Sequence, residues 1–519
     1  MPKSPLADPA FRSLWVAEGV SGIGTWMQTV GAQWMLVHQA HAATLVSIVQ
    51  AASLLPVMFV SLPAGVLADL LDRRQLLLAA QGGMAVIAAL LAVLTAVHLT
   101  TPTLLITLTF LLGCGQALTN PAWQAIQPTL VSREQIPAAA ALNSMNVNIS
   151  RAIGPALAGV IVAVSGSWVV FTINAVSFTG VLIALARWHE HPDSRTSAQT
   201  LLPAMRSGTR YLRYAPGVRR ILLRAGLFVV PASALWALLA IVASQRLRIG
   251  SGGYGLLLAA LGVGAVAGAL TLSRIRQRMS SNAILVVFSL VFAAGIAVAG
   301  TVTNTPAVVV AMVISGVAWL AVLSTLNTVM QLALPAWVRA RALSMYLIVF
   351  MGGQGVGSLL WGAIAGPLGT PAALVIAAVV LAAGVVTFAW IPLHSLTETM
   401  DRTIAHFPEP TLAFTPAPDD GPVIVAVIYR VPADQAGSFV TAMGKLSESR
   451  QRTGATRWGL FRDAGDAERY VELFEVPSWS EHELQHQERV TGFDADILTE
   501  TRRYAADDPE VRHLIAVQT

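Results

Sequence analysis

Long apolar segments, each able to cross a lipid bilayer, recur through most of the chain and constrain its fold more than any other feature. A transmembrane helix needs about 20 predominantly apolar residues. Six such segments come first, near 13–37, 44–69, 76–98, 103–123, 141–164 and 167–186. Six more follow an arginine-rich stretch, near 218–245, 252–272, 281–303, 306–330, 341–364 and 371–391. The sequence therefore predicts an all-α polytopic membrane protein with twelve transmembrane helices, six in each half.

The composition supports this prediction and argues against several other classes. The 519 residues are 55% hydrophobic and 12% charged, whereas soluble proteins are about 25% charged. Cys114 is the only cysteine, so neither an intramolecular disulfide nor a cysteine metal site can form. The sequence has no Walker-type phosphate loop, which argues against ATP-driven transport, and we expect no cofactor. The N-terminus, from Met1 to Trp15, lacks a signal-peptide layout and is expected not to be cleaved.

The arginines predict the orientation of the helices. The net charge of +5 comes almost entirely from arginine, because Lys3 and Lys445 are the only lysines. Cytoplasmic loops of membrane proteins are enriched in basic residues, and with twelve helices most loop arginines fall on one side. They are Arg73, Arg74, Arg133, Arg187, Arg195, Arg206, Arg210, Arg213, Arg219, Arg220, Arg274, Arg276, Arg278, Arg339 and Arg341, with Arg246 and Arg248 as exceptions. We therefore expect a multi-pass protein of the inner (cytoplasmic) membrane, with both termini cytoplasmic and no nucleic-acid partner.

An internal repeat relates the two halves. A shift of 203 residues brings Gly65 onto Gly268 and Arg73 onto Arg276. The same shift brings a group of fifth-helix residues onto their counterparts: Ile153 onto Val356, Gly154 onto Gly357, Gly159 onto Gly362, Ile161 onto Ile364 and Gly166 onto Gly369. One ungapped offset that holds across about 100 residues indicates parallel repeats.

The composition changes after Pro392. Residues 393–421 are polar and proline-rich and are predicted to form a linker. Beyond it we expect strands at Val423–Val431, Thr456–Arg462, Arg469–Val476 and Val511–Val517, a helix at 434–451, and a second helix opened by a Ser478–Glu481 capping box. This order is the ferredoxin-like pattern. The expected domains are a six-helix bundle at 1–190, a cytoplasmic central loop at 191–217, a second bundle at 218–392, the linker, and a soluble α+β ferredoxin-like domain at 422–519 that can pair into dimers.

A short charged turn, residues 65–74, follows the second apolar segment. It resembles the motif G-x-x-x-D-R/K-x-G-R/K-R/K of the major facilitator superfamily, which is matched here by Gly65, Asp69, Arg73 and Arg74. Leu70 and Asp72 depart from the motif, since a basic residue and a glycine are usual there. The resemblance implies the major facilitator fold and a cytoplasmic latch between the two halves; the alternative is a simple surface turn. In the second half Leu272 stands in place of the acid, so only the first half can carry the full latch.

The run from Gly154 to Gly159 resembles the glycine-proline motif of the antiporter branch of that superfamily. Small residues such as Gly154 and Gly159 let helices pack closely, and Pro155 frees a carbonyl and bends the helix. The family motif begins further upstream with more glycines, so the match is partial. A purely structural kink is the alternative.

Two ionisable side chains lie well inside predicted helices. Glu18 lies about seven residues into the first helix, and Arg151 about ten residues into the fifth, so Arg151 is near the bilayer midplane at about 1.5 Å per residue. A charge there is costly unless it faces water or an opposite charge. We expect both side chains to face a central cavity, with Arg151 binding an anionic substrate or pairing with Glu18, and Glu18 taking up a coupling proton. A structural ion pair is the alternative.

Further polar side chains of the helices can line the transport path. They are Gln28, Gln124, Asn148, Asn327 and Gln354, together with Trp26, Gln33, Trp34, Asn120, Asn143, Asn146 and Gln331. The repeat offset places Gln124 on Asn327 and Arg151 on Gln354, so the same helix faces are polar in both halves. Each of these residues can instead form a helix–helix hydrogen bond or a cap.

The C-terminal domain offers little catalytic signal. His482 and His486 stand four residues apart and share one helical face, but no third metal ligand is evident, so we expect a solvated helix face and no metal site. We find no arrangement of nucleophile, base and orienting group, and expect no catalytic residues.

Taken together, these residues resemble a branch of the superfamily called the transmembrane secretion effector family, which includes the enterobactin exporter. The resemblance rests on Phe11–Trp34, on Asn148–Pro155 and on the tail from Trp479 to Asp494. It implies a secondary exporter of a small amphipathic or anionic molecule, siderophore-like or drug-like, that works by proton antiport and alternating access. Members with such a tail carry a domain similar to the antibiotic-biosynthesis monooxygenase fold. The alternative is therefore a transporter whose C-terminal domain is a small monooxygenase-like enzyme or a ligand sensor. The partners expected are the substrate, protons and the lipid bilayer.

Overall fold

The computed structural model describes residues 4–126, 130–188, 210–211, 213–390, 392–393 and 413–517. Most of the expected central loop and most of the expected linker lie outside these residues. The chain divides into two compact units. One comprises 1–198, 224–327 and 346–392, and the other comprises 199–223, 328–345 and 393–519.

The first half of the membrane part is a bundle of long helices. A short helix, η1 (Pro5–Ala7), precedes them, and η3 (Arg133–Gln135) connects two of them. The helices are α1 (Pro9–Leu36), α2 (Ala42–Leu54), α3 (Pro56–Leu70), α4 (Arg73–Ala96), α5 (Pro102–Ile126), α6 (Ile136–Ser165) and α7 (Ser167–Arg187). The second expected span is therefore two helices, interrupted before Pro56, whose ring supplies no backbone N–H.

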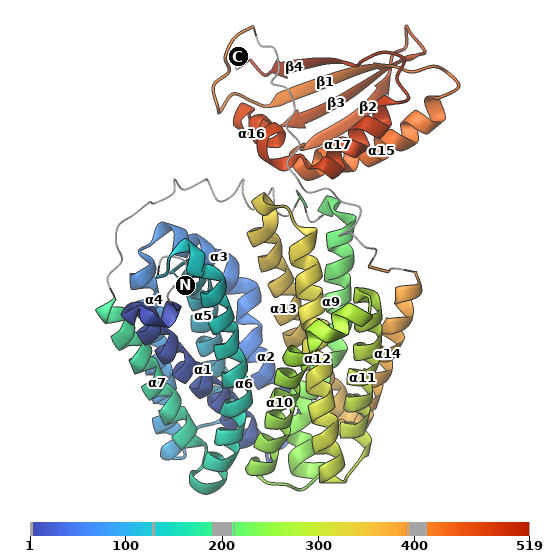
Figure 1. The fold of residues 1–519 in the computed structure, drawn as a ribbon. Helices are drawn as coiled ribbons and strands as arrows, with labels where there is room; N and C mark the ends of the chain where they lie inside the picture. Colours follow the sequence, from blue (N-terminus) through green and yellow to red (C-terminus); the bar gives the residue numbers. More distant parts are fainter. Residues whose placement is uncertain are drawn as a thin grey trace. The chain divides into compact units, whose positions relative to one another are not determined.

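The second half repeats this arrangement. It contains α9 (Pro216–Ile241) with the π-helical turn η4 (Val242–Arg246), α10 (Ser251–Arg278), α11 (Ser281–Thr301), α12 (Thr305–Ala333), α13 (Ala336–Leu368), α14 (Thr370–Val386) and the short η5 (Thr387–Ala389). Figure 1 shows α1–α7 gathered in one bundle and α9–α14 in another beside it. The repeat appears in the backbone as well, because Gly166 and Gly369 precede α7 and α14 with nearly equal positive φ angles of 84° and 82°.

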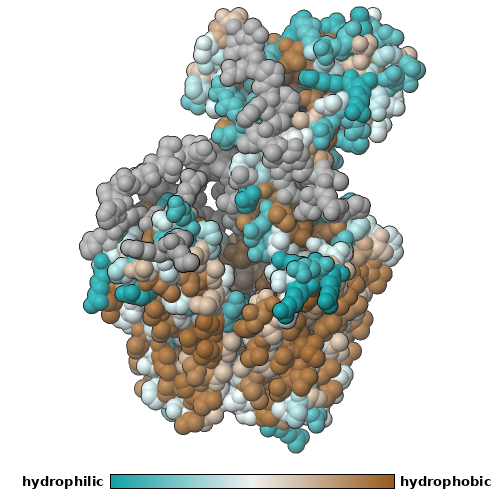
Figure 2. All heavy atoms as spheres, viewed as in Figure 1, coloured by the Kyte–Doolittle hydropathy of each residue, from teal (hydrophilic) through white to brown (hydrophobic). Residues whose placement is uncertain are grey.

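Eleven segments of the described chain are long and apolar enough to cross a membrane. α1, the first of the twelve expected spans, has 28 residues but is not among these eleven, since it carries more polar side chains, Glu18 among them. The outer walls of both bundles are apolar in Figure 2, and many large apolar side chains of the helices are exposed, Phe59, Val164 and Leu270 among them. In water such walls would be unfavourable, whereas lipid accommodates them. The predicted polytopic all-α fold is confirmed.

The C-terminal domain is an antiparallel sheet covered by helices. Its elements are β1 (Val423–Arg430), α15 (Ala436–Thr453), β2 (Arg457–Arg462), β3 (Arg469–Val476), α16 (Trp479–Leu484), the π-helical turn η6 (Gln485–Arg489), α17 (Gly492–Arg502) and β4 (Glu510–Ile515). The strand order is β2-β3-β1-β4, as the ferredoxin-like pattern requires. The helices lie on one face of the sheet (Figure 1).

Alternation along β1 places one set of side chains in the core of this domain. Val423, Val425, Val427 and Tyr429 are buried against Phe439, Met443, Leu446 and Phe474. The capping box expected between Ser478 and Glu481 is only half formed. Ser478 accepts a hydrogen bond from the Glu481 backbone N–H at 3.3 Å, but the Glu481 carboxylate pairs with Arg489 at 2.6 Å. A separate helix, α17, follows, and it is opened by a capping box between Thr491 and Asp494.

Candidate functional site

Glu18 and Arg151 lie on neighbouring helices. α1 and α6 pack closely, since Asn146 donates to the Trp15 carbonyl at 2.9 Å and Ser150 donates to the Gly19 carbonyl at 3.3 Å. Glycine is needed on α1 because a Cβ at Gly22 would lie 2.7 Å from the Ser150 hydroxyl. This packing fixes the backbone that carries the two charged side chains.

The two charges do not neutralise each other. Among the described residues, no ion pair joins Glu18 to Arg151, although the sequence suggested one. Glu18 Oε2 and Arg151 Nε are buried and make no hydrogen bond to the described chain. The Arg151 guanidinium carbon lies 5.7 Å from the ring centroid of Trp26, which is cation–π distance. The first half thus holds an acid and a cation inside the membrane part, neither of them paired with an opposite charge.

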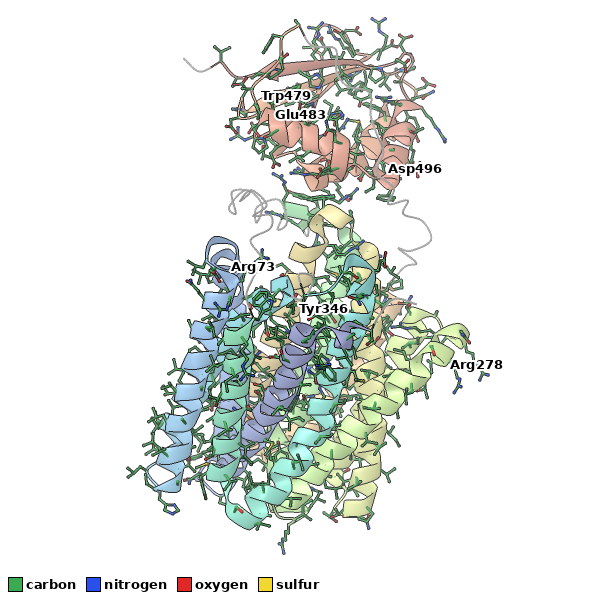
Figure 3. The ribbon with its side chains drawn as sticks, turned by 60° about the vertical axis from the view of Figure 1, so that its left-hand side comes forward. Arg73, Arg278, Tyr346, Trp479, Glu483 and Asp496 are labelled. Atoms are coloured by element: carbon green, nitrogen blue, oxygen red, sulfur yellow. The ribbon has the colours of Figure 1, made fainter. Side chains whose placement is uncertain are left out.

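A chain of aromatic rings continues from Trp26 into the second half. The Trp26 ring lies 6.3 Å from Trp236 of α9, and Trp236 lies 5.4 Å from Trp319 of α12. Phe350 of α13 follows at 5.7 Å from Trp319, and Tyr346 stacks on Phe350 at 6.3 Å. Figure 3 labels Tyr346 on its helix. The indole N–H groups of Trp236 and Trp319 and the Tyr346 hydroxyl make no hydrogen bond within the described chain, so the chain of rings offers both ring faces and polar donors.

A buried polar contact joins the halves nearby. Gln33 of α1 donates to Gln50 Oε1 of α2 at 2.5 Å, and its own carbonyl oxygen accepts from the Tyr254 hydroxyl of α10. The Tyr254 ring also stacks on Trp34 with ring centroids 6.0 Å apart. Sequence analysis named Gln33 and Trp34 as path residues but did not identify Tyr254, whose relation to Gln33 arises only when the halves meet.

The other polar residues expected in the path have varied surroundings. Gln28 accepts from Asn174 of α7, and Asn148 donates to Ser144 of its own helix at 2.8 Å. Gln124 and Asn327 are exposed on α5 and α12. Gln354 is buried on α13, the helix that carries Tyr346 and Phe350. The contacts of Gln28 and Asn148 are thus internal to the first half, as the helix–helix alternative allowed.

The charged turn is built into the first half. Gly65 and Asp69 lie in α3, and their side chains fall outside the described part of the structure. Asp72 caps α4 by accepting from the Gln75 N–H at 3.0 Å. Arg74 donates to the carbonyls of Leu185 and Ala186 at 2.9 and 2.8 Å. Those carbonyls end α7, where a cation is favourable, so Arg74 fastens α4 to α7. Arg73 lies at the same turn (Figure 3).

The glycines of α6 make close helix contacts. A Cβ at Gly154 would lie 2.6 Å from Trp26 Cβ, and one at Gly159 would lie 2.8 Å from Gly255 Cα of α10. The Ser251 hydroxyl donates to the Gly159 carbonyl at 3.2 Å, and the Pro155 carbonyl faces Gly255. The run from Gly154 to Gly159 therefore packs against α1 and also against α10 of the other half.

The equivalent crossing on the other side of the repeat joins α13 to α2. A Cβ at Gly362 would lie 2.4 Å from Ser47 Cβ, and Thr44 donates to the Gly362 carbonyl at 3.4 Å. The repeat offset relates Gly159 to Gly362, so the two crossings are counterparts.

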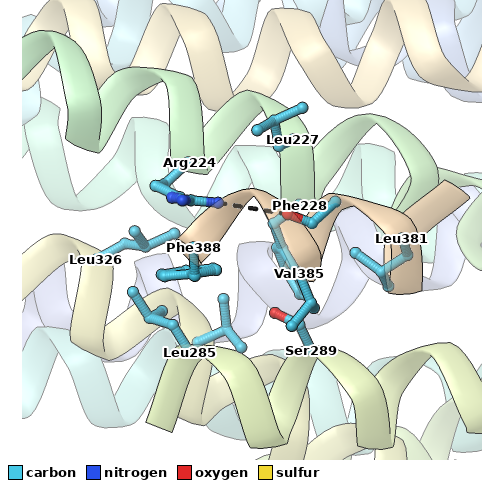
Figure 4. Close-up of a pocket in the computed structure, with 11 residues that line it drawn as sticks. Arg224, Leu227, Phe228, Leu285, Ser289, Leu326, Leu381, Val385 and Phe388 are labelled. Atoms are coloured by element: carbon cyan, nitrogen blue, oxygen red, sulfur yellow. Dashed lines mark hydrogen bonds between the residues drawn. The ribbon is translucent and has the colours of Figure 1, made fainter. Parts of the chain in front are cut away.

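A second arginine within a helix, Arg224 of α9, is hydrogen-bonded near the end of α14. It donates to Thr387 Oγ1 at 2.6 Å and to the Gly384 carbonyl at 3.4 Å, and its guanidinium lies 3.4 Å from the Phe388 ring centroid. Figure 4 shows this arrangement beside a cavity of about 20 Å³. Another cavity, of about 90 Å³, lies inside the first half next to Gln28 and Asn174. Both are far below the roughly 300 Å³ of a small-molecule site.

The C-terminal domain has its own polar core. Glu472 of β3 is fully buried and accepts from Tyr429 at 3.1 Å, Arg450 at 3.0 Å and Trp458 at 3.0 Å. Burial, followed by the Glu472 charge, raises the pKa of Tyr429. Because Glu472 already accepts hydrogen bonds from three donors, its role is structural and it is not available as a general base.

The expectation of a solvated histidine face is wrong for His482. Only 1% of that residue is exposed. His486 and His513 are half-buried beside it, and the third histidine comes from β4, 27 residues after His486. No spacing rule in the sequence connects a helix residue to a strand so distant in the chain.

Two repeated helical halves that meet at a charged and aromatic region define a secondary transporter of the major facilitator type. The sequence profile of the transmembrane secretion effector family matches residues 1–519, and the chain belongs to this family. The predicted family is thereby confirmed, and the protein is a multi-pass membrane protein of a bacterial transporter family.

Known relatives agree with this assignment. The chain is 27% identical over 374 residues to the enterobactin exporter EntS of Shigella boydii, across 70% of this chain and 87% of that protein. It is 33% identical over 165 residues to the staphyloferrin A transporter of Staphylococcus aureus, across 31% of this chain and 42% of that protein.

Solved transporters share the fold. A bacterial homologue of the human lysosomal transporter Spinster, solved inward-facing and unoccupied, aligns with a TM-score of 0.58 and 14% identity over 76% of this chain and 97% of that chain. The POT family transporter PepTSo aligns with a TM-score of 0.61 and 12% identity over 75% of this chain and 98% of that chain.

Proposed function

We propose that this protein exports a small amphipathic or anionic molecule, siderophore-like or drug-like, from the cytoplasm by proton antiport. The observation that carries the proposal is the unneutralised pair, Glu18 and Arg151. A charge inside a membrane helix is costly, and such residues commonly serve substrates or protons. The names of the two relatives support a siderophore as cargo.

Arg151 is the proposed anchor for an anionic group of the substrate. Carboxylates and phenolates form charge-assisted hydrogen bonds with guanidinium groups. The rings of Trp26, Trp236 and Trp319 would receive the apolar or aromatic part, because aromatic side chains offer large contact areas and indole donors. A molecule with one acidic end and one flat apolar end fits both features.

Glu18 is the proposed proton carrier. A carboxyl group in a membrane helix can alternate between protonated and charged forms as the site opens to either side. The substrate at Arg151 and a proton on Glu18 would be carried in alternation, in opposite directions across the membrane. Export would then be driven by protons entering the cell.

Alternating access would use the two glycine crossings, α6 with α10 and α13 with α2. Close backbone contact at Gly159 and Gly362 lets two bundles rock on each other with little side-chain rearrangement. The turn at Gly65–Arg74 would act as the latch at the opposite end, which we assign to the cytoplasm together with both termini, on the strength of the loop arginines.

Purified protein in liposomes provides the test. The vesicles carry an imposed pH gradient, and the cargo is a labelled carboxylate or catecholate siderophore. We expect gradient-driven uptake that a protonophore abolishes. Transport that persists unchanged with the protonophore would refute antiport, and no transport of any siderophore would refute the substrate class.

Glu18→Gln separates proton coupling from binding. We expect the variant to lose gradient-driven transport and to retain exchange of labelled for unlabelled substrate. The exposed loop acid Glu134 supplies the matched control, and Glu134→Gln should behave as wild type. Full gradient-driven transport by Glu18→Gln would refute the proton role.

The second candidate is an enzyme or ligand sensor in the C-terminal domain. Its own core and the buried Tyr429–Glu472–Arg450 network favour a preorganised domain of this kind. Assaying residues 415–519 for oxidation of quinol-like substrates and for ligand binding tests it.

Apolar side chains on the open face of the sheet, Ile424 and Leu514 among them, are exposed. We propose that two copies of the protein pair through this face.

A further inference from the structure

Three histidines of the C-terminal domain bring their ring nitrogens together. His482, His486 and His513 each offer one nitrogen, and these atoms lie within 4.8 Å of one another. The ring centroids of His482 and His486 are 4.6 Å apart, and those of His482 and His513 are 4.8 Å apart.

The fold fixes this convergence from two elements. His482 and His486 lie four residues apart across α16 and η6, which places both rings on one helical side. β4 pairs antiparallel with β1, and His513 stands opposite Val425. Val425 is buried among core residues on the helix-covered face. Cross-strand partners share a face, so His513 points toward the helices.

Trp479 forms a wall of the cluster. Its ring lies 5.2 Å from His482 and 6.1 Å from His513. Its indole N–H donates to Glu483 Oε1 at 3.0 Å. This hydrogen bond holds the ring in place and engages the Glu483 carboxylate. Figure 3 labels Trp479 and Glu483 at this end of the domain.

Buried nitrogens at the centre of the cluster have no hydrogen bond. His482 is 1% exposed, yet neither of its ring nitrogens makes a hydrogen bond within the described chain, and neither does His513 Nε2. Nearly all buried polar groups in proteins are paired. Unpaired imidazole nitrogens that face one another are suited to share a cation.

We propose that His482, His486 and His513 bind one divalent transition-metal ion, with Zn²⁺ the best fit. Imidazole is a preferred ligand of Zn²⁺, Cu²⁺, Ni²⁺ and Fe²⁺, whereas Mg²⁺ and Ca²⁺ prefer oxygen. Three histidines leave the fourth tetrahedral position open to water or another ligand. With Zn–N bonds of about 2.05 Å, ligand nitrogens stand roughly 3.3 Å apart, which small ring rotations can reach.

The electrostatics permit the ion. Burial, followed by the neighbouring imidazole charges, lowers the pKa of His482 to about 3, and burial lowers the pKa of His486 to about 4. Both are therefore neutral near pH 7, which is the form that binds metal. Arg450 is a nearby cation, but Glu472 neutralises it with a contact of 3.0 Å. Gln485 lies beside His482 with Oε1 unpaired, available to orient the ring as an outer partner.

The full-length protein, purified in detergent through a tag without histidines and stripped with a chelator, is titrated with Zn²⁺. We expect one tightly bound ion per chain and the visible spectrum of a tetrahedral nitrogen site with Co²⁺. His482→Asn, His486→Asn and His513→Asn should each weaken Zn²⁺ binding by about 100-fold or more, since even outer partners contribute 10–100-fold. Arg512→Ala, next to His513 on the same exposed strand, should bind as wild type.

A second measurement avoids variants that fail to fold. Zn²⁺ should protect the half-buried His486 and His513 of the wild-type protein from carbethoxylation, mapped by mass spectrometry, while exposed His38 reacts equally with and without metal. Absence of stoichiometric Zn²⁺ binding would overturn the proposal. So would binding that leaves His486 and His513 as reactive as before, or that survives in all three variants.

Discussion

The two halves of the membrane part each contain an arginine within their helices, and the two side chains are used differently. Arg224 of the second half is engaged by Thr387, Gly384 and Phe388 at the end of α14. Arg151 of the first half lies beside the Trp26 ring without such hydrogen bonds, although the Nε atoms of both arginines are buried and make no hydrogen bond within the described chain. A cation at a helix C-terminus contributes to the fold, whereas a cation without a counter-charge in a membrane helix is available to a ligand.

The repeat sharpens this difference. The 203-residue offset relates Glu18 to Ile221 and Arg151 to Gln354, and both counterparts are uncharged and buried. The second half instead supplies Trp236, Trp319 and Phe350. The two repeats thus differ at equivalent positions, with Glu18 and Arg151 in the first half and with Trp236, Trp319 and Phe350 in the second.

The largest expected effect on transport comes from a bulky side chain placed at the contact between the halves. Gly159→Leu would drive a side chain into Gly255, and overpacking costs up to about 3 kcal/mol, equivalent to roughly a 100-fold loss of transport. Liposome uptake measures it. Gly180→Leu is the matched control, because nothing lies within 4 Å of a Cβ there. Equal activity of the two variants would show that the α6–α10 contact is dispensable.

Arg151→Gln tests the functional arginine. Loss of one charge-assisted hydrogen bond of about 1.5–3 kcal/mol should raise the KM for an anionic siderophore by roughly 10–100-fold, with little change in thermal stability. An esterified, neutral analogue should show no such difference. If Arg151→Gln instead lowered stability and left KM intact, the side chain would be structural.

Arg224→Gln should give the reverse result. The variant removes hydrogen bonds to the end of α14 and should lower stability by about 2 kcal/mol. Thermal unfolding in detergent measures the loss, and the KM of the remaining folded protein should match wild type. Exposed Arg278, labelled in Figure 3, supplies the control variant Arg278→Gln. A raised KM in Arg224→Gln would erase the contrast between the two arginines.

The smallest effect tests the equivalence of the halves. Gly166→Ala and Gly369→Ala place a Cβ at positive φ, which costs about 1 kcal/mol at each site. We expect similar reductions in thermal stability for the two variants, measured side by side. A clear difference between the two losses of thermal stability would mean that the two turns contribute unequally to stability despite their matching backbone.

Much of the fold was predictable because membrane helices and their repeat produce local patterns in the sequence. The expected spans agree with the helices except at Pro56. That proline marks the break between α2 and α3, but the sequence analysis placed it inside one continuous span. The strands and helices of the C-terminal domain were predicted from local patterns, and their order along the chain indicated the ferredoxin-like fold. Glu18 and Arg151 were recognisable because charges are rare in apolar segments, although the ion pair between them, one of the alternatives considered, is not among those of the described residues.

The missed features depend on distant contacts. Tyr254 meets Gln33 only when the two halves come together, and His513 meets His482 only when β4 completes the sheet. The sequence analysis did not single out Trp236 and Trp319. Their place in the row of rings that starts at Trp26 follows from how α9 and α12 pack.

The break between α2 and α3 has a mechanical consequence. Leu55 separates α2 from α3, and the side chains of Leu55 and Met58 lie close to Gly355 and Gly352 of α13. An interrupted helix bends more easily than a continuous one, because Pro56 contributes no backbone hydrogen bond. We therefore expect α3, with the charged turn at its end, to tilt independently of α2 when α13 moves.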